Sequence, residues 1–430
     1  PPDTLRERQL PAEGNPPAAL VSPPAALVHR NALAPLQAQS PKNMKELQDI
    51  ITDFLAIKSR GQTAALATVV KVKGSTYRRP GARMLMTQDG CMTGSISGGC
   101  LENDVFEHAK QVMASGEPTL VKYDPEVAEE IIWALGLGCN GAVHVLIERL
   151  DKQLTFIAEC LINRHSGVLA TVFYVEGQLQ AKVGNHLMLY PDKTVISEIA
   201  DSTLSQAVIA DAQAALYEQK SKVQTYQLPA GRAEVLIEFI KPPTPLLIFG
   251  AGQDAIPVVS FAKELGWHVT VVDHRPTYLT PEKFPNADSL ILTSAEAAHK
   301  RVLLENNTVA ITMTHNYFHD RELLKMLLPS AVRYIGVLGP KRRTAELLQD
   351  LHSEGIVYTQ EQLSRLYAPV GIDIGADTPV EIALSIVAEI QAVLAKCSAG
   401  LLRDRIGPIH HRIDELDVQA IQSTQQHISI

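Results

Sequence analysis

A short apolar stretch that runs into two closely spaced glycines is the feature that most constrains how this chain can fold. Residues 246–249 read Leu-Leu-Ile-Phe, and Gly250-Ala251-Gly252 follows them directly. A helical pattern comes next, and a second β-branched stretch then ends at Asp273. A strand, a glycine turn and a helix in this order are typical of the first unit of a parallel sheet with helices on both faces.

The same alternation continues along the chain. Strand-like and helical stretches follow one another over residues 290–293, 309–314, 321–328, 334–338 and from 341 onwards. A threonine, a proline and a glutamate at positions 378, 379 and 381 form a capping box that predicts the start of a last long helix. The fold class that we predict is α/β, with a Rossmann-like, doubly wound parallel sheet over residues 246–396.

The residues before this sheet have a different pattern, and the proline-rich segment 241–245 separates the two parts. The pattern indicates helices at 44–58 and 201–219 and strands at 64–71, 83–86, 91–96, 142–147, 155–160, 167–174, 186–190, 223–228 and 232–239. We therefore predict a second α/β domain over residues 44–240. Residues 1–43 contain nine prolines and are expected to form a disordered leader, and residues 397–430 a peripheral tail.

Charge and cysteine content exclude several classes of protein. A net charge of −8 gives no electrostatic reason to expect nucleic acid or an anionic membrane as a partner. Five cysteines at irregular spacing do not form a disulfide framework and fit a reducing cytoplasm. No segment approaches the ~20 apolar residues that span a bilayer. We expect a cytoplasmic protein that forms homo-oligomers and binds neither nucleic acid nor membrane.

Two cysteines stand in glycine-rich turns. Gly98 and Gly99 precede Cys100, and a second turn of this kind, rich in glycine, contains Cys139. A helical pattern begins just after Cys100, which places its thiol near a helix N-terminus, where free amide groups and the macrodipole favour a thiolate. The alternative is that both cysteines are small buried hydrophobes. The turns favour the first interpretation, because glycine lets a ligand approach the backbone closely.

The glycines after the first strand of the parallel sheet match a dinucleotide fingerprint. Gly250 and Gly252 hold the first two glycine positions, and Ala255 stands at the third. Asp273 ends the next strand, where a carboxylate binds the ribose 2′-hydroxyl of an adenosine nucleotide such as NAD(P). Arg275, nearby, leaves the choice between NAD and NADP open. The alternative is a Rossmann-like fold that binds no nucleotide.

Polar and basic residues follow two further strands of this sheet. His315 comes after the strand at 309–314, and Gly339 precedes a basic run that includes Arg342. Because ligands bind at the carboxyl ends of parallel strands, we expect His315 to contact a ligand or act as a general base. Gly339 and Arg342 are expected to hold a phosphate at a helix start. A polar surface is the alternative for each.

Taken together, these motifs resemble the xanthine dehydrogenase accessory family of the XdhC/CoxI type. The residues that carry the resemblance are 73–75, 79–84, 94–102, 136–139, 247–252, 314–315, 334–339 and 369–375. The resemblance runs from about residue 47 to about residue 396, in the module order of the family. Asn140 and Pro340 depart from the family pattern, the first of them in the second cysteine turn.

The resemblance implies a maturation factor with no catalytic residues. Such proteins bind molybdenum cofactor (molybdopterin), protect it while its terminal sulfido ligand is installed, and deliver it to a molybdenum hydroxylase of the xanthine dehydrogenase type. A cysteine desulfurase is the implied sulfur donor. Carried onto this chain, Cys100 is the thiol that contacts the cofactor and its metal, and Cys139 is its companion.

The residues around Cys100 are chemically compatible with this role. A thiolate is a soft metal ligand. Gly98, Gly99 and Glu102 belong to its turn, and Arg79 and Arg83 offer cations to the cofactor's phosphate, unless they form a solvated basic hairpin.

Two rival functions remain open from the sequence. The first is an NAD(P)-dependent oxidoreductase, for which His315 and Asp320 are the obvious acid–base pair. The second is a nucleotide-sensing interaction protein without any molybdenum role. An oxidoreductase leaves the two cysteine turns unexplained, and we take the cofactor chaperone as the leading hypothesis.

Overall fold

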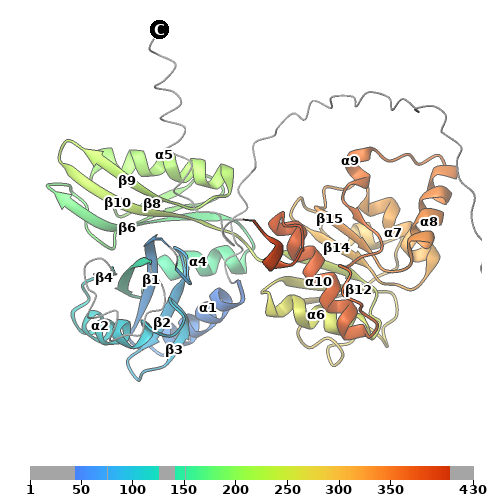
Figure 1. Cartoon of the computed structure of the whole chain (residues 1–430), viewed down its shortest axis with the longest axis horizontal. Coiled ribbons are helices and arrows are strands. Elements are labelled where there is room, and N and C mark those ends of the chain that lie inside the picture. Colours follow the sequence, from blue (N-terminus) through green and yellow to red (C-terminus); the bar gives the residue numbers. More distant parts are fainter. Residues whose placement is uncertain (1–43, 75, 125–140, 151, 407–430) are drawn as a thin grey trace, which may run out of the picture. The chain divides into compact units, whose positions relative to one another are not determined.

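A computed structural model describes residues 44–74, 76–124, 141–150 and 152–406, which form three β-sheets with helices (Figure 1). The first two sheets are antiparallel and the third is parallel. The mixed α/β class is therefore confirmed, whereas the domain boundaries at 240 and 246 stay predictions. Within the described residues, no helix is both long and apolar enough to cross a bilayer.

The first sheet has five strands in the order β3-β2-β1-β5-β4. These are β1 (Ala64–Lys73), β2 (Arg83–Thr87), β3 (Met92–Gly94), β4 (Thr119–Tyr123) and β5 (Ala142–Arg149). Helix α2 (Glu102–Ser115) covers one face of this sheet, because Val105, Ala109 and Val112 recur at helical spacing and are buried against it.

The second sheet also has five strands, in the order β8-β7-β6-β10-β9. These are β6 (Gly167–Gly177), β7 (His186–Leu189), β8 (Val195–Ser197), β9 (Lys222–Leu228) and β10 (Gly231–Ile240). Helix α5 (Ser202–Glu218) packs on it through Leu204, Val208 and Ala212. The carboxylate of Asp201 caps this helix by accepting the N–H of Leu204 at 3.0 Å.

A shared apolar core joins the first two sheets. Helices α1 (Met44–Ser59) and α4 (Lys152–Ile162) pack in it together with residues of β1, β2, β6, β7 and β10. The strand that we expected at 155–160 is wrong, since these residues lie in α4. The helix is apolar over most of its surface, so the sequence lacks the polar face that would have distinguished it from a buried strand.

The third sheet has six parallel strands in the order β13-β12-β11-β14-β15-β16. These are β11 (Pro245–Phe249), β12 (His268–Asp273), β13 (Ser289–Leu292), β14 (Val309–Thr312), β15 (Tyr334–Val337) and β16 (Leu366–Tyr367). The order reverses between β11 and β14, as in a Rossmann sheet. The prediction of a doubly wound parallel sheet is therefore confirmed.

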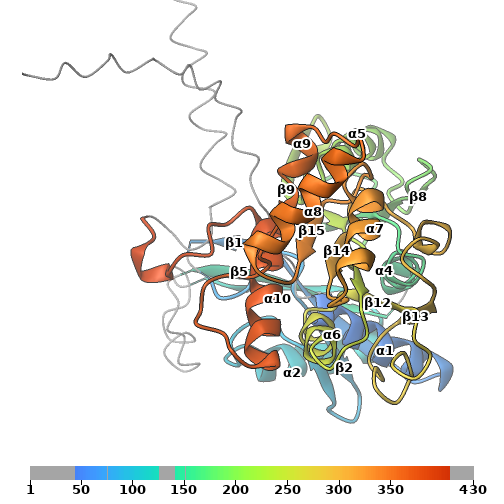
Figure 2. The same cartoon turned by 90° about the vertical axis from the view of Figure 1, so that its right-hand side faces the viewer.

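Helices cover both faces of the third sheet. Helices α6 (Ala255–Glu264) and α10 (Pro379–Ala395) lie side by side against one face (Figure 2). Helices α7 (Tyr317–Leu327) and α8 (Lys341–Ser353) cover the other face, and a short helix, α9 (Gln360–Leu363), precedes β16. Successive residues of β11, such as Ile248 and Phe249, point to opposite faces of the sheet and enter two different cores.

The capping box predicted for the last helix is confirmed. The hydroxyl of Thr378 accepts the N–H of Glu381, and the Glu381 carboxylate accepts the N–H of Thr378 at 2.9 Å.

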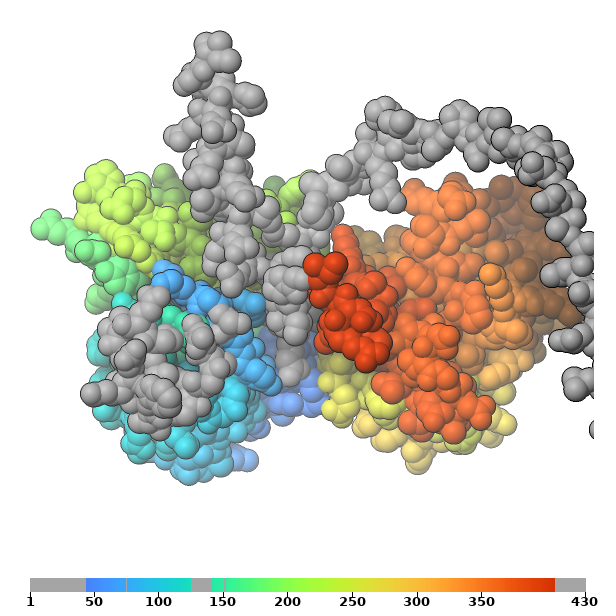
Figure 3. All heavy atoms as spheres, in the orientation of Figure 1, coloured from blue at the N-terminus to red at the C-terminus, as the bar shows by residue number. Residues whose placement is uncertain are grey.

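Helix α10 lies at the surface in the orientation of Figure 3. Its side chains at Val380 and Leu384 are exposed.

Candidate functional site

Residues 95–101 connect β3 to α2 and form the Cys100 loop. Its entry is fixed by Gly94, whose φ is +88° and where a Cβ would lie 2.4 Å from the carbonyl oxygen of Arg83. Inside the loop, Gly99 also has a positive φ, +107°. Side chains other than hydrogen are strained at both positions, so these two glycines determine the path of the chain.

The carboxylate of Glu102 holds the Cys100 loop together. It accepts the N–H of Ser97 at 3.0 Å and that of Leu101 at 3.1 Å, and it also accepts the hydroxyl of Ser95 at 3.0 Å. Burial by itself raises the pKa of Glu102, but the hydrogen bonds from Ser97 and Ser95 outweigh burial and lower that pKa. Glu102, predicted to contact the cofactor, is therefore occupied by amides and hydroxyls of the loop.

The thiol of Cys100 lies at the edge of the core beneath α2. Its side chain is half-buried, and its Sγ donates to the Oγ of Ser97 over 3.6 Å. Gly98 and Gly99, immediately before it, are exposed. Leu101 is the N-cap residue of α2, which confirms that Cys100 stands at a helix start. The loop thus presents a thiol beside two glycines that leave the backbone open to a ligand.

Cys139, the predicted companion of Cys100, lies outside the described residues. Within those residues, no group of three or more His, Cys, Asp or Glu side chains is placed to hold a metal ion. The other described cysteines differ from Cys100: Cys91 and Cys397 are exposed, and Cys160 is buried. Burial raises the pKa of Cys160 to about 12, as expected of a structural thiol.

The arginines predicted to bind a phosphate have different surroundings. Arg83 is 4% exposed and its guanidinium forms a buried ion pair with Glu238, in which one N–O distance is 2.9 Å. It is therefore not available to a ligand at the surface. Arg78, which neighbours the predicted residues, donates twice to the carbonyl oxygen of Ser95, at 2.8 and 2.9 Å. The guanidinium of Arg79 has no hydrogen bond or ion pair with another described residue.

The second group of predicted residues meets at the carboxyl edge of the third sheet. Residues 250–254 follow β11 and residues 313–316 follow β14, so both loops flank the point where the strand order reverses. Ligands of doubly wound sheets bind in the crevice at this point. Gly250 has a φ of +120°, and a Cβ there would lie 2.3 Å from the carbonyl oxygen of Met313, so the two loops are in close contact.

The carboxylate of Asp273 is fully engaged inside the protein. It accepts the N–H of Ala251 at 2.7 Å, and from Arg275 it accepts the backbone N–H at 2.8 Å and two guanidinium N–H groups at 2.9 and 2.7 Å. Burial raises its pKa, but the hydrogen bonds from Arg275 and Ala251 prevail and lower the pKa to about 2. A carboxylate has about four acceptor positions, and these four bonds fill them.

His315 lies beside Asp254 rather than beside the acid that we had paired with it. Its Nε2 is 2.7 Å from Oδ2 of Asp254, which begins α6. Asp320 instead accepts the hydroxyl of Thr314 and a guanidinium N–H of Arg343, both at 2.6 Å. The acid–base pair that an oxidoreductase would require from His315 and Asp320 is therefore not assembled here.

Gly339 and Arg342 lie at the start of α8, as predicted. Gly339 has a φ of +132°, and Pro340 caps the helix without a side-chain hydrogen bond. The Arg342 side chain is 89% exposed and pairs with Glu346 one turn along, at 2.8 Å. A phosphate contact at this helix start stays a prediction.

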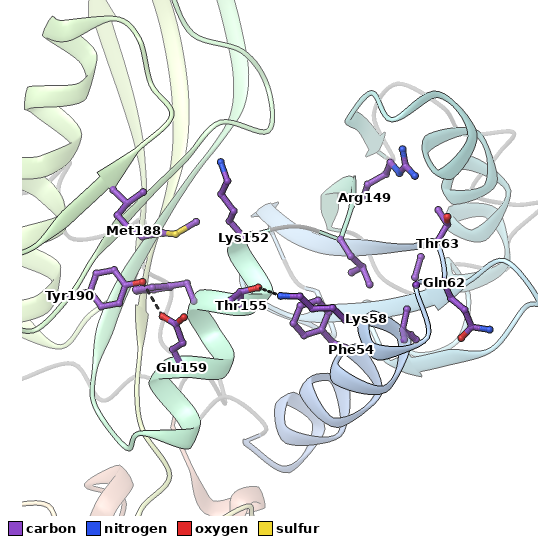
Figure 4. Close-up of a pocket in the computed structure, with 16 residues that line it drawn as sticks. Phe54, Lys58, Gln62, Thr63, Arg149, Lys152, Thr155, Glu159, Met188 and Tyr190 are labelled. Atoms are coloured by element: carbon purple, nitrogen blue, oxygen red, sulfur yellow. Dashed lines mark hydrogen bonds between the residues drawn. The ribbon is translucent and has the colours of Figure 1, made fainter.

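Sequence reasoning missed one cleft entirely. A cavity of about 670 Å³ lies at the end of the first sheet where β1 begins (Figure 4). In it, Lys58 donates to the hydroxyl of Thr155 at 3.2 Å, and Tyr190 donates to Glu159 at 3.0 Å. Its lining comes from α1, β1, β5, α4, β7 and β8 and the segments between them, so no local motif could have indicated it.

Family models match both parts of the chain. The XdhC Rossmann domain matches residues 246–390. The XdhC and CoxI family matches residues 57–124 and 160–227, which include the Cys100 loop and its glycines.

Whole-chain relatives agree with these matches. Over 338 residues the chain is 34% identical to a probable subunit of xanthine dehydrogenase from Bacillus subtilis, covering 76% of this chain and 92% of the relative. It is 23% identical over 334 residues to the molybdenum cofactor insertion chaperone PaoD of Escherichia coli, covering 77% and 84%. A crystal structure described as a xanthine dehydrogenase from Bacillus halodurans matches with a TM-score of 0.65 at 29% identity, covering 81% and 96%. The chain belongs to the XdhC and CoxI family.

Proposed function

We propose that this protein binds molybdenum cofactor as its cargo at the Cys100 loop and supports maturation of a molybdenum hydroxylase. The observation that carries the proposal is a half-buried thiol between two exposed glycines and a helix start. A soft sulfur ligand suits molybdenum, and the glycines give a bulky ligand access to the backbone. The similarity to PaoD, itself described as a molybdenum cofactor insertion chaperone, supports the same role.

The residues around the thiol have different roles in this proposal. Glu102 fixes the loop from inside through its bonds to Ser97 and Leu101, so the Cys100 thiol is presented in one position before any ligand arrives. Arg79, whose guanidinium has no partner among the described residues, is the arginine left to meet the cofactor's phosphate. Cys139 is proposed as a second thiol for the metal.

The finer steps of the role follow from the family resemblance. The protein would shield the cofactor while a cysteine desulfurase supplies the terminal sulfur, then deliver it to a hydroxylase of the xanthine dehydrogenase type. We place this in the cytoplasm, with the protein acting as a homo-oligomer and not as a catalyst. Hydride transfer with NAD(P) is the weaker candidate, because Asp273 and His315 are both engaged within the protein.

A deletion strain tests the proposed function. Without this gene, a molybdenum hydroxylase of the host should be made and folded but inactive, and treatment of the extract with sulfide and dithionite should restore part of its activity. The wild-type gene and the Cys91→Ala variant should complement the deletion, whereas Cys100→Ala should not. Full hydroxylase activity in the deletion strain would show that the protein has another function.

A further inference from the structure

The Gly250 loop, residues 250–254, has a carboxylate in the space that it should leave for a ligand. In a dinucleotide fingerprint the second glycine has no side chain, so that the diphosphate can approach the backbone at the start of the helix. Here a Cβ built on Gly252 would lie 2.4 Å from Oδ1 of Asp254. The carboxylate of Asp254 therefore occupies the space beside Gly252, at the start of α6.

His315 holds that carboxylate in place from the other side of the crevice. Its Nε2 is 2.7 Å from Oδ2 of Asp254, and its Cδ2 is 4.0 Å from the Cβ position of Gly252. The backbone of His315 is left-handed, with a φ of +55°, which is uncommon for a residue other than glycine. The Asp254 side chain is only 16% exposed. The two residues join the loops after β11 and β14, at the point where the strand order reverses.

The ribose half of the same site is also occupied. Asp273 is the acid that would accept the adenosine ribose hydroxyl, and its carboxylate already binds Ala251 and Arg275 through four hydrogen bonds. A ribose would have to displace the Arg275 guanidinium, and charge-assisted hydrogen bonds of this kind are the strong ones. A diphosphate would in addition meet the negative charge of Asp254 at close range.

We propose that the Rossmann module of this protein is filled by its own side chains and binds no nicotinamide dinucleotide through the Gly250 loop. Asp254 takes the place of the diphosphate at the start of α6, with His315 as its partner. Arg275 takes the place of the ribose hydroxyls on Asp273. The module keeps the fold of a dinucleotide-binding domain, and two side chains close its ligand site.

The test is a titration of the full-length protein with NADH and NADPH, in which binding is measured by nucleotide fluorescence and by calorimetry. The wild-type protein should show no saturable binding. The double variant Asp254→Ala/Arg275→Ala should bind the dinucleotide saturably. Its Kd should be at least roughly tenfold lower than the weakest Kd that the wild-type titration could have detected, a difference of about 1.4 kcal/mol in binding free energy. Asp254→Asn, which keeps the size of the side chain, should give part of this gain even if the double variant folds poorly.

A matched control removes one acid and one base elsewhere on the same module. Glu322 and Lys325 form an ion pair on α7, and their double alanine variant should bind no dinucleotide. Saturable binding of NADH or NADPH by the wild-type protein that Asp273→Ala abolishes would overturn the proposal. So would a folded double variant and a folded Asp254→Asn variant that both bind nothing, because side chains other than these would then close the site.

Discussion

The Cys100 loop and the Gly250 loop have the same construction and different outcomes. Each leads from a strand into a helix through glycines. In each, a carboxylate accepts backbone N–H groups of the loop: Glu102 in the first loop and Asp273 in the second. In the Cys100 loop Gly98 and Gly99 are exposed and the thiol beside them is half-buried. In the Gly250 loop a second carboxylate, Asp254, fills the space beside Gly252. A glycine motif therefore indicates the backbone path, and the neighbouring side chains decide whether a ligand can use it.

The largest expected effect separates two arginines beside the Cys100 loop. Arg83→Ala should lower the free energy of unfolding by about 3–5 kcal/mol, because it removes one partner of an ion pair whose two side chains are both buried. Arg79→Ala should change it by less than about 0.5 kcal/mol and should weaken cofactor binding instead. Urea unfolding of both variants measures the difference. Equal stability of the two would mean that the buried Arg83–Glu238 pair does not contribute to the stability of the fold.

The next effect concerns the carboxylate inside the Cys100 loop. Glu102→Ala should cost about 2–3 kcal/mol of unfolding free energy, since it removes charge-assisted bonds to Ser97 and Leu101. Glu107→Ala is the matched control, because Glu107 lies exposed on the same helix and, among the described residues, forms an ion pair with Lys110 alone. If both variants unfold at the same urea concentration, the loop is held by something other than Glu102.

A pH series examines the corresponding carboxylate of the Gly250 loop. The pKa of Asp273 is lowered from 3.8 to about 2 in the folded protein, so its stabilising effect is complete above pH 3.8 and is lost as the pH falls through about 2. The difference in unfolding free energy between wild type and Asp273→Asn should therefore be constant at higher pH and shrink below about pH 4. A difference that stays constant down to about pH 3 would contradict the Arg275 and Ala251 contacts.

The smallest expected effect on stability is at Gly98. Within the described part of the chain, a Cβ there would meet only the ring of Tyr77, at 3.9 Å, which is an ordinary contact. Gly98→Ala should therefore leave the unfolding transition nearly unchanged. At Gly99 the φ of +107° should make the same substitution cost about 1 kcal/mol or more. If the cofactor approaches this backbone, Gly98→Ala should nevertheless lower cofactor occupancy. Unchanged occupancy would place the cofactor elsewhere on the loop.

The sequence predicts most of the fold, because its signals there are local. Strand–helix alternation after residue 245 and the capping box at Thr378 act over a few residues and are both confirmed. The site is harder to predict, because Arg79 and Arg83 have the same chemistry and only tertiary packing buries one of them. The closing of the Gly250 loop depends on Asp254 and His315, which are 61 positions apart. The one sequence signal of this closing is the acid Asp254, two residues after Gly252, the second glycine of the fingerprint.

The most direct measurement is the molybdenum content of protein purified anaerobically from a host that makes molybdopterin. The account predicts that the wild type and Cys91→Ala retain molybdenum and the absorbance of the bound cofactor, and that Cys100→Ala loses most of both while unfolding at the same urea concentration. Removing a half-buried thiol leaves little cavity, so a change of fold should not obscure the result. A Cys100→Ala protein that holds as much molybdenum as the wild type would contradict the assignment of the Cys100 loop as the cofactor site.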